Sequence, residues 1–129
     1  AERVLAAVRF VTTLDQTRHL PLGLCGASTG AAAALVAAAR EPRVTAIVSR
    51  GGRPDLAGRK LAAVAAPTLL IVGSEDRDVL QLNRQALAQL TCEKQLAVVP
   101  GATHLFEEPG TLEEAARLAA EWFARHLRA

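Results

Sequence analysis

Four short apolar runs alternate with stretches of helical periodicity, and this alternation limits the possible folds more than any other feature of the sequence. Successive strands joined through a helix pair in parallel by right-handed crossovers, so their carboxyl ends meet at one edge of the sheet. Ligands bind along that edge in open α/β sheets. The predicted strands span residues 20–25, 44–49, 68–72 and 95–99. We therefore expect an α/β fold with four parallel strands and flanking helices.

Apolar residues at helical spacing flank and separate these strands. The predicted helices span residues 2–14, 31–39, 56–64, 79–90 and 111–123. Glu41-Pro42 ends the second helix, because proline has no amide hydrogen and restricts the residue before it. Thr111 and Glu114 form a capping-box pattern, which predicts that the last helix starts at Thr111.

The overall composition excludes several classes of protein. The chain has 129 residues, a length that suits one domain, and its net charge is +2. No Lys/Arg block could follow a phosphate backbone, so we expect no nucleic-acid partner. No apolar run approaches the roughly 20 residues of a membrane helix, and no signal-peptide pattern is present, so we expect a cytoplasmic protein without a membrane partner. Cys25 and Cys92 form no CxxC pair, which predicts neither a metal site nor a disulfide.

The segment Gly26-Ala27-Ser28-Thr29-Gly30 fits G-x-S-x-G and lies between a predicted strand and a predicted helix. This is the setting of a nucleophile elbow, in which a strained turn projects a serine hydroxyl above the sheet. The glycines let strand and helix approach closely. The amide of Thr29 lies at a helix N-terminus, where it could stabilise an oxyanion. The alternative is a turn of small residues that only permits tight packing.

Two later residues favour the elbow interpretation. Asp76 follows the third predicted strand and His104 the fourth, so both should reach the same edge as Ser28. A serine hydroxyl needs a base, and a neutral imidazole needs a carboxylate that fixes its tautomer. Taken alone, each would be an ordinary loop residue. Among the neighbouring carboxylates, Asp78 is expected to cap the next helix, which leaves Asp76 as the candidate acid.

Three segments resemble the dienelactone hydrolase-like branch of the α/β-hydrolase superfamily. They are Gly26-Ala-Ser-Thr-Gly-Ala-Ala-Ala-Ala-Leu35, Ala66-Pro-Thr-Leu-Leu-Ile-Val-Gly-Ser-Glu-Asp76 and Val99-Pro-Gly-Ala-Thr-His-Leu-Phe-Glu-Glu-Pro109. The resemblance covers nearly the whole chain and is closest to small hydrolases without a lid, which also occur fused to phosphoribosyltransferase domains. It implies the C-terminal half of an α/β-hydrolase fold.

The chain departs from this family in two ways. Dienelactone hydrolase proper resembles the pattern but uses a cysteine nucleophile, whereas Ser28 stands at the elbow here and Cys25 comes too early. Family members also have strands before the elbow, with a loop that supplies a second oxyanion amide. We therefore expect residues 1–129 to be one truncated domain. Its exposed sheet edge would favour a homodimer or an N-terminal segment as partner.

Several other residues carry weaker expectations. Arg50 and Arg53 follow the second predicted strand and could bind a carboxylate or phosphate group of the substrate, although surface-loop arginines are the simpler alternative. Cys25 is expected to be a buried residue of the first strand. His19 and His126 are expected to face solvent.

Together these observations predict a serine hydrolase that cleaves a carboxylic ester or related acyl bond of a small molecule through an acyl-enzyme intermediate. Ser28 would be the nucleophile, His104 the base and Asp76 the acid. No metal or organic cofactor is expected. Two alternatives remain open: a non-catalytic scaffold or interaction domain with the same fold, and an acyltransferase that uses the same triad.

Overall fold

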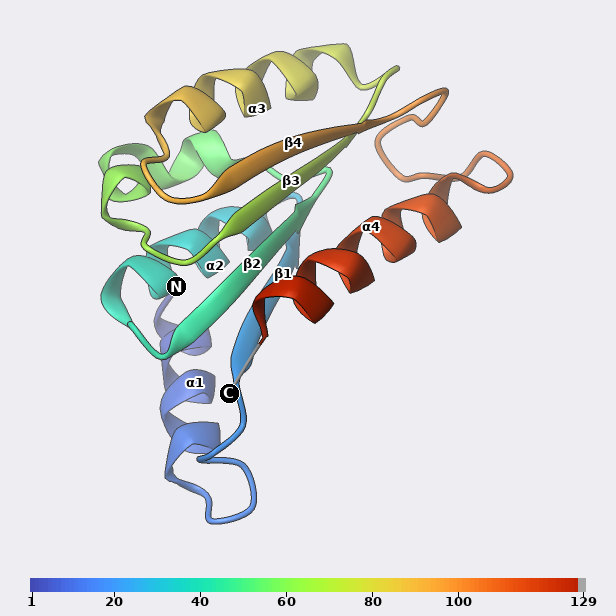
Figure 1. Cartoon of the computed structure of the whole chain (residues 1–129). Helices are drawn as coiled ribbons and strands as arrows, with labels where there is room; N and C mark the ends of the chain where they lie inside the picture. Colours follow the sequence, from blue (N-terminus) through green and yellow to red (C-terminus); the bar gives the residue numbers. More distant parts are fainter. Residues whose placement is uncertain (128–129) are drawn as a thin grey trace.

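A computed structural model of the chain describes residues 1–127 and consists of one sheet with helices on both faces (Figure 1). The elements are α1 (Glu2–Thr13), β1 (Leu22–Ala27), α2 (Thr29–Arg40), β2 (Val44–Arg50), the 3₁₀ segment η1 (Pro54–Ala63), β3 (Thr68–Gly73), α3 (Arg77–Gln89), β4 (Lys94–Val99) and α4 (Thr111–His126). The predicted α/β fold with four strands and flanking helices is confirmed.

The four strands are parallel and lie in the order β1-β2-β3-β4. Each strand therefore pairs with its neighbour in the sequence, as short helical crossovers favour. The carboxyl ends of the strands meet at one edge of the sheet. The segments that follow β1, β3 and β4 contain Ser28, Asp76 and His104, so the topology brings all three toward this edge.

The two faces of the sheet are covered unequally. One face packs against α1, α2, η1 and α3 around a core that includes Leu35, Ile47, Leu61 and Leu70. Figure 1 shows α4 on the opposite face, where Trp122 packs against sheet residues. Since four helical elements share one face and one helix covers the other, the α4 face leaves more of the sheet open.

The boundaries of three elements differ from the sequence prediction. β1 begins at Leu22 rather than Leu20, because Pro21 has no amide hydrogen for the ladder. η1 is a kinked 3₁₀ segment rather than a regular helix, since Gly58 adopts φ 56° and ψ −130°. α3 begins at Arg77 rather than Val79, because the amide of Leu80 donates to the carbonyl of Asp76 and closes the first turn there.

The start of α4 at Thr111 is confirmed, but the predicted capping box is wrong. The Thr111 hydroxyl donates to the carbonyl of Glu108 at 2.8 Å instead of accepting from the helix. Gly110 stands at the N-cap position with a left-handed φ of 80°. The Glu114 side chain accepts from Arg117, so neither half of the box forms.

Candidate active site

Ser28 occupies a strained turn between β1 and α2. Its φ of 50° and ψ of −126° lie in a region that residues with side chains rarely adopt. The close approach of strand and helix depends on Gly26, because a Cβ there would lie 2.6 Å from the carbonyl oxygen of Gly30. A Cβ on Gly30 would meet nothing within 4 Å, so of the two motif glycines Gly26 is the one required by packing.

The carbonyl of Ser28 is held by two amides from different elements. The amide of Ala31 donates to it at 3.2 Å from within α2, and the amide of Arg53 donates at 2.9 Å from the loop after β2. Two donors on one carbonyl fix the orientation of the peptide that follows the serine. The strained turn is therefore supported from outside the β1–α2 connection as well as from within it.

The structure brings the three candidates Ser28, His104 and Asp76 into one hydrogen-bonded chain. Ser28 Oγ lies 3.1 Å from His104 Nε2, and His104 Nδ1 lies 2.7 Å from Asp76 Oδ2. The side chain of His104 is 41% exposed and that of Asp76 is 13% exposed. The carboxylate is thus largely enclosed, while the imidazole remains open to an incoming molecule.

The loop that carries His104 is braced at both of its ends. Glu108 accepts from the amide of Thr103 at 3.0 Å and from its hydroxyl at 2.6 Å, and these bonds lower the pKa of the Glu108 carboxyl. On the other side of His104, Phe106 is buried with a positive φ of 55°. These contacts fix the loop so that the imidazole faces Ser28.

A second set of contacts joins the β3–α3 loop to the β4–α4 loop. The amide of Glu75 donates to the carbonyl of Ala102 at 3.0 Å, and the amide of Gly101 donates to Ser74 Oγ at 2.8 Å. Gly73 has no room for a side chain, since a Cβ there would lie 2.2 Å from the Ala102 oxygen. These contacts set the separation between Asp76 and His104.

The neighbouring acidic residues have other positions. Asp78 is exposed in the first turn of α3 and does not occupy the N-cap, so the prediction that it caps this helix is wrong. Asp76 itself stands at the N-cap, but its side chain makes no capping bond and turns to His104 instead. Glu75 is exposed and accepts from Ser74. The contact with His104 therefore distinguishes Asp76 from both neighbours.

Thr29 is the first residue of α2 and is exposed. The amides of a first helical turn have no partner within the helix and carry a partial positive charge. The amide of Thr29 thus lies next to the serine hydroxyl, where negative charge would be favoured.

The two arginines after β2 have different partners. The Arg50 guanidinium lies 5.6 Å from the centre of the Phe106 ring, on the α4 side of the sheet. Arg53 forms two hydrogen bonds with the carboxylate of Asp55, at 3.0 and 2.9 Å, and this pairing lowers the pKa of the Asp55 carboxyl. Arg53 is therefore already neutralised, whereas Arg50 contacts an aromatic ring. A role in substrate binding stays a prediction for both.

Two predictions about burial are wrong. Cys25 is exposed rather than buried, because it lies on the α4 face of an edge strand, where it lines a shallow groove with Arg50. His126 does not face solvent: its side chain is 10% exposed, its ring packs at a tilt against Trp122, and its Nε2 lies 3.3 Å from Glu93 Oε2. The exposure of His19 is confirmed.

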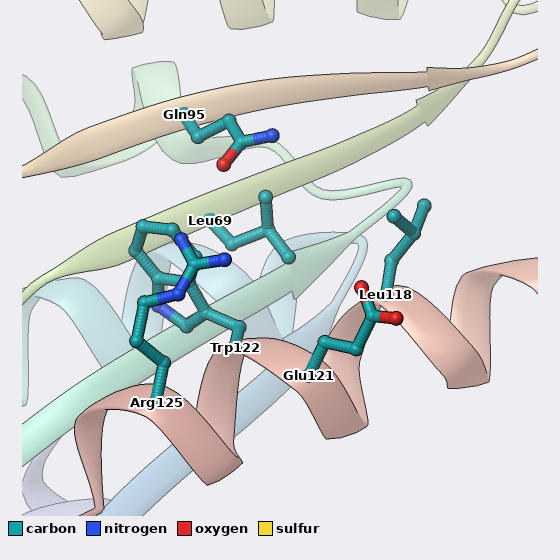
Figure 2. A pocket seen from close by; sticks show the side chains of 6 residues that line it. All are labelled: Leu69, Gln95, Leu118, Glu121, Trp122 and Arg125. Atoms are coloured by element: carbon teal, nitrogen blue, oxygen red, sulfur yellow. The ribbon is translucent and has the colours of Figure 1, made fainter.

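A separate pocket lies between α4 and the sheet, near the amino ends of β3 and β4 (Figure 2). It is lined by Leu69, Gln95, Leu118, Glu121, Trp122 and Arg125. The Trp122 indole nitrogen donates to the carbonyl of Pro67 at 3.2 Å, which anchors α4 at this end. Because this pocket is at the opposite end of the strands from Ser28, it is not part of the candidate active site.

Two further features of the described residues bear on function. Residues 1–127 contain no group of three or more His, Cys, Asp or Glu side chains that could hold a metal ion. Within the same part of the chain, no helix has both the length and the apolar character needed to cross a membrane.

Comparison with known proteins places this architecture in the α/β-hydrolase class. The esterase domain of a Rhodothermus marinus protein has a TM-score of 0.83 at 19% identity, a match that covers 98% of this chain and 69% of that one and shows the fold alone. A dienelactone hydrolase from Anabaena variabilis has a TM-score of 0.96 at 54% identity, over 98% of this chain and 59% of that one. The sequence model of the dienelactone hydrolase family matches residues 1–128. The chain belongs to the dienelactone hydrolase family.

A longer relative has a different name. A Mycobacterium tuberculosis protein called "Putative phosphoribosyl transferase", found in two strains, is 60% identical over 129 residues. The match covers 98% of this chain but 29% of that protein. The chain thus spans less than a third of this curated relative and 59% of the Anabaena structure.

Proposed function

We propose that the protein is a serine hydrolase that cleaves a carboxylic ester or related acyl bond of a small molecule. The observation that carries this proposal is the chain of two hydrogen bonds from Ser28 Oγ through His104 to Asp76, at 3.1 and 2.7 Å. The order serine, acid, histidine along the sequence is that of α/β-hydrolases.

In this proposal each of the three residues has one role. With its Nδ1 proton donated to Asp76, the His104 ring presents Nε2 as an acceptor to the Ser28 hydroxyl. Ser28 Oγ would attack the carbonyl carbon while its proton moves to Nε2. The bond to the leaving alcohol then breaks, and the proton passes from His104 to the alkoxide. Asp76 would stabilise the imidazolium throughout.

Water would then hydrolyse the acyl-enzyme intermediate. His104 would take a proton from the attacking water, and the acyl–serine bond would break as that proton returns to Ser28 Oγ. The Thr29 amide would stabilise the oxyanion of both tetrahedral intermediates. An Arg50 side chain near this edge could attract an anionic group of the substrate, whereas Arg53 would first have to leave Asp55.

The name of the mycobacterial relative does not displace this proposal. That name belongs to a protein of which this chain matches 29%, and the match covers 98% of this chain. We therefore assign the hydrolase reaction to this segment and make no assignment to the remainder of the relative.

Labelling with a fluorophosphonate probe, together with hydrolysis of p-nitrophenyl esters of increasing chain length, tests the proposal. Ser28→Ala should abolish both, because the hydroxyl supplies the chemistry and little packing. Cys25→Ala is the matched control, since this thiol lies on β1, three residues before Ser28, and lines the α4 groove. We expect it to behave as the wild type.

Two results would overturn the proposal. If Cys25→Ala is inactive while Ser28→Ala is labelled, the assignment of Ser28 as the nucleophile is wrong. If the folded full-length protein neither reacts with the probe nor hydrolyses any ester, the non-catalytic alternative is correct. Release of the acyl group to an added alcohol or amine faster than to water would instead favour an acyltransferase.

A further inference from the structure

Asn83 is a polar side chain enclosed in the apolar interior. It lies on the inner face of α3 with Leu80 and Ala86 and is 0% exposed. An amide removed from water is destabilising unless its polar atoms find partners, and among the described residues the Asn83 nitrogen has two partners while its buried Oδ1 has none. Its presence at a core position therefore calls for a specific set of contacts.

The amide group of Asn83 uses both of its hydrogens. Nδ2 donates to the carbonyl of Gly52 at 3.0 Å and to the carbonyl of Val79 at 2.8 Å. Both partners are acceptors, which fixes which end of the amide faces them. One bond stays within α3, and the other joins α3 to the loop after β2.

The Gly52 carbonyl belongs to the same peptide group as the amide of Arg53. That amide donates to the carbonyl of Ser28 at 2.9 Å. A single peptide plane is therefore bound on one side by Asn83 and on the other side by the strained serine. Hydrogen bonds arranged in such a chain polarise and strengthen one another.

Other contacts also restrain the loop after β2. Gly52 has no space for a side chain, because a Cβ there would lie 2.1 Å from Ser49 Oγ and 2.4 Å from the Ala31 Cβ. The amide of Gly51 donates to the carbonyl of Ile71 at 2.7 Å. The loop thus lies between the elbow and the central strand, and the orientation of its Gly52–Arg53 peptide depends on Asn83.

We propose that Asn83 is a positioning residue for the nucleophile, which it holds through the Gly52–Arg53 peptide. This inference rests on the function proposed above. Without the Asn83 amide, the Gly52 carbonyl loses a buried donor and the peptide can rotate. The Arg53 amide then supports the Ser28 carbonyl less well, and Ser28 Oγ spends less time aligned with His104 Nε2.

The test compares Asn83→Ala with Leu80→Ala, a truncation one turn away on the same buried face of α3. Asn83→Ala should slow fluorophosphonate labelling and lower kcat by about tenfold, with KM within about twofold, because one buried hydrogen bond is lost. Leu80→Ala should destabilise the fold at least as much. Assayed well below its unfolding midpoint, it should keep the wild-type kcat.

Hydrogen exchange of the Arg53 amide gives a readout that does not depend on catalysis. Exchange at this amide should accelerate about tenfold in Asn83→Ala and not in Leu80→Ala. Asn83→Leu replaces the amide with an apolar side chain that has no donors, and it is the variant to use if Asn83→Ala does not fold. It should also slow labelling and accelerate exchange of the Arg53 amide.

Unchanged Arg53 exchange in the Asn83 variants, or accelerated exchange with unchanged labelling, would overturn the inference. An equal loss of kcat in Leu80→Ala would also overturn it, because the effect would then be general destabilisation. If the wild type does not label at all, the proposed function fails, and unchanged exchange at Arg53 would still separately refute the contact with Asn83.

Discussion

β1 and β3 deliver two of the candidate catalytic residues from very different surroundings. All six residues of β3 are buried between β2 and β4, whereas β1 lies at the end of the sheet and exposes Cys25 and Ala27. Asp76 follows β3, and Ser28 follows β1. The acid thus takes its position from the centre of the sheet. The position of the nucleophile depends on two features: the close approach of strand and helix that Gly26 permits, and the hydrogen bond from the amide of Arg53 to the Ser28 carbonyl.

The largest expected effect tests the acid delivered by β3. Asp76→Asn should lower kcat by about 10⁴-fold, because an amide in place of the carboxylate holds the imidazole in the wrong tautomer. Asp78→Asn is the matched control, since Asp78 is exposed and lies in the first turn of α3. It should cost under about 1 kcal/mol of stability and leave kcat unchanged. Ester hydrolysis measures kcat and urea unfolding measures stability for both variants. If Asp78→Asn loses kcat and Asp76→Asn does not, Asp78 is the acid.

A smaller effect should separate the two strands in stability. Leu70→Ala removes a side chain that is 0% exposed at the centre of the sheet and should cost about 3–4 kcal/mol. Leu24→Ala on β1 affects a residue that is partly buried against the same core and should cost about half as much. Urea unfolding midpoints with an unchanged slope give both values. Equal costs would contradict the view that β1 is less firmly held than β3.

The sequence was most informative where periodicity and turn chemistry act locally. The alternation of apolar runs and helices was sufficient to predict four parallel strands, and β3, the most strand-like run, was predicted within one residue of its observed end. The pairing of Asp76 with His104 followed from the same topology. The order of the strands then explains how His104 approaches two residues far from it in the sequence. Asp76 is 28 positions away and Ser28 is 76 positions away.

The sequence was least informative about burial, because tertiary contacts determine which side chains are covered. The exposure of Cys25 could not be predicted, since it depends on how far α4 covers the face of β1 on which Cys25 lies. The His126 side chain is covered because Trp122 and Glu93 approach it from α4 and the segment before β4. Asn83 was missed, although a polar residue three positions from both Leu80 and Ala86 on an apolar helix stripe was the available signal.

The exposed position of β1 predicts self-association of the chain. Among residues 1–127 its outer side pairs with no strand, and an apolar groove that includes Leu20 and Leu22 lies beside it. Unpaired strand edges act as templates for association. Size-exclusion chromatography should show a shift from monomer to dimer or larger species as concentration rises. Leu20→Lys should weaken this association, since Leu20 is 63% exposed.

Leu105→Lys is the matched control for association, because Leu105 is 64% exposed on the histidine loop and not on the segment that leads into β1. It should leave the association unchanged. A chain that stays monomeric at all concentrations would contradict the prediction. It would mean that the outer edge of β1 does not promote association, although it pairs with no strand.

The smallest expected effect concerns the thiol that β1 leaves accessible. Partial burial raises the pKa of the Cys25 thiol, and the positive charge of Arg50 opposes that shift. Because the thiolate is the reactive form, iodoacetamide should alkylate Cys25 more slowly in the folded chain than in urea at the same pH. The folded state retains the thiol proton, so this group favours folding at low pH. That contribution is lost as the pH rises through the raised pKa.

Arg50→Gln removes the opposing charge and should slow alkylation of Cys25 by a further factor of about two to five, the size expected for one partly exposed charge. Arg53→Gln is the control, because the Arg53 guanidinium is paired with Asp55 and should not affect the thiol. Mass spectrometry of the labelled peptide at pH 8 to 10 measures each rate constant. Faster alkylation in Arg50→Gln would mean that Arg50 acts on Cys25 by covering it rather than by its charge. In that case β1 would be more protected at its carboxyl end than its edge position implies.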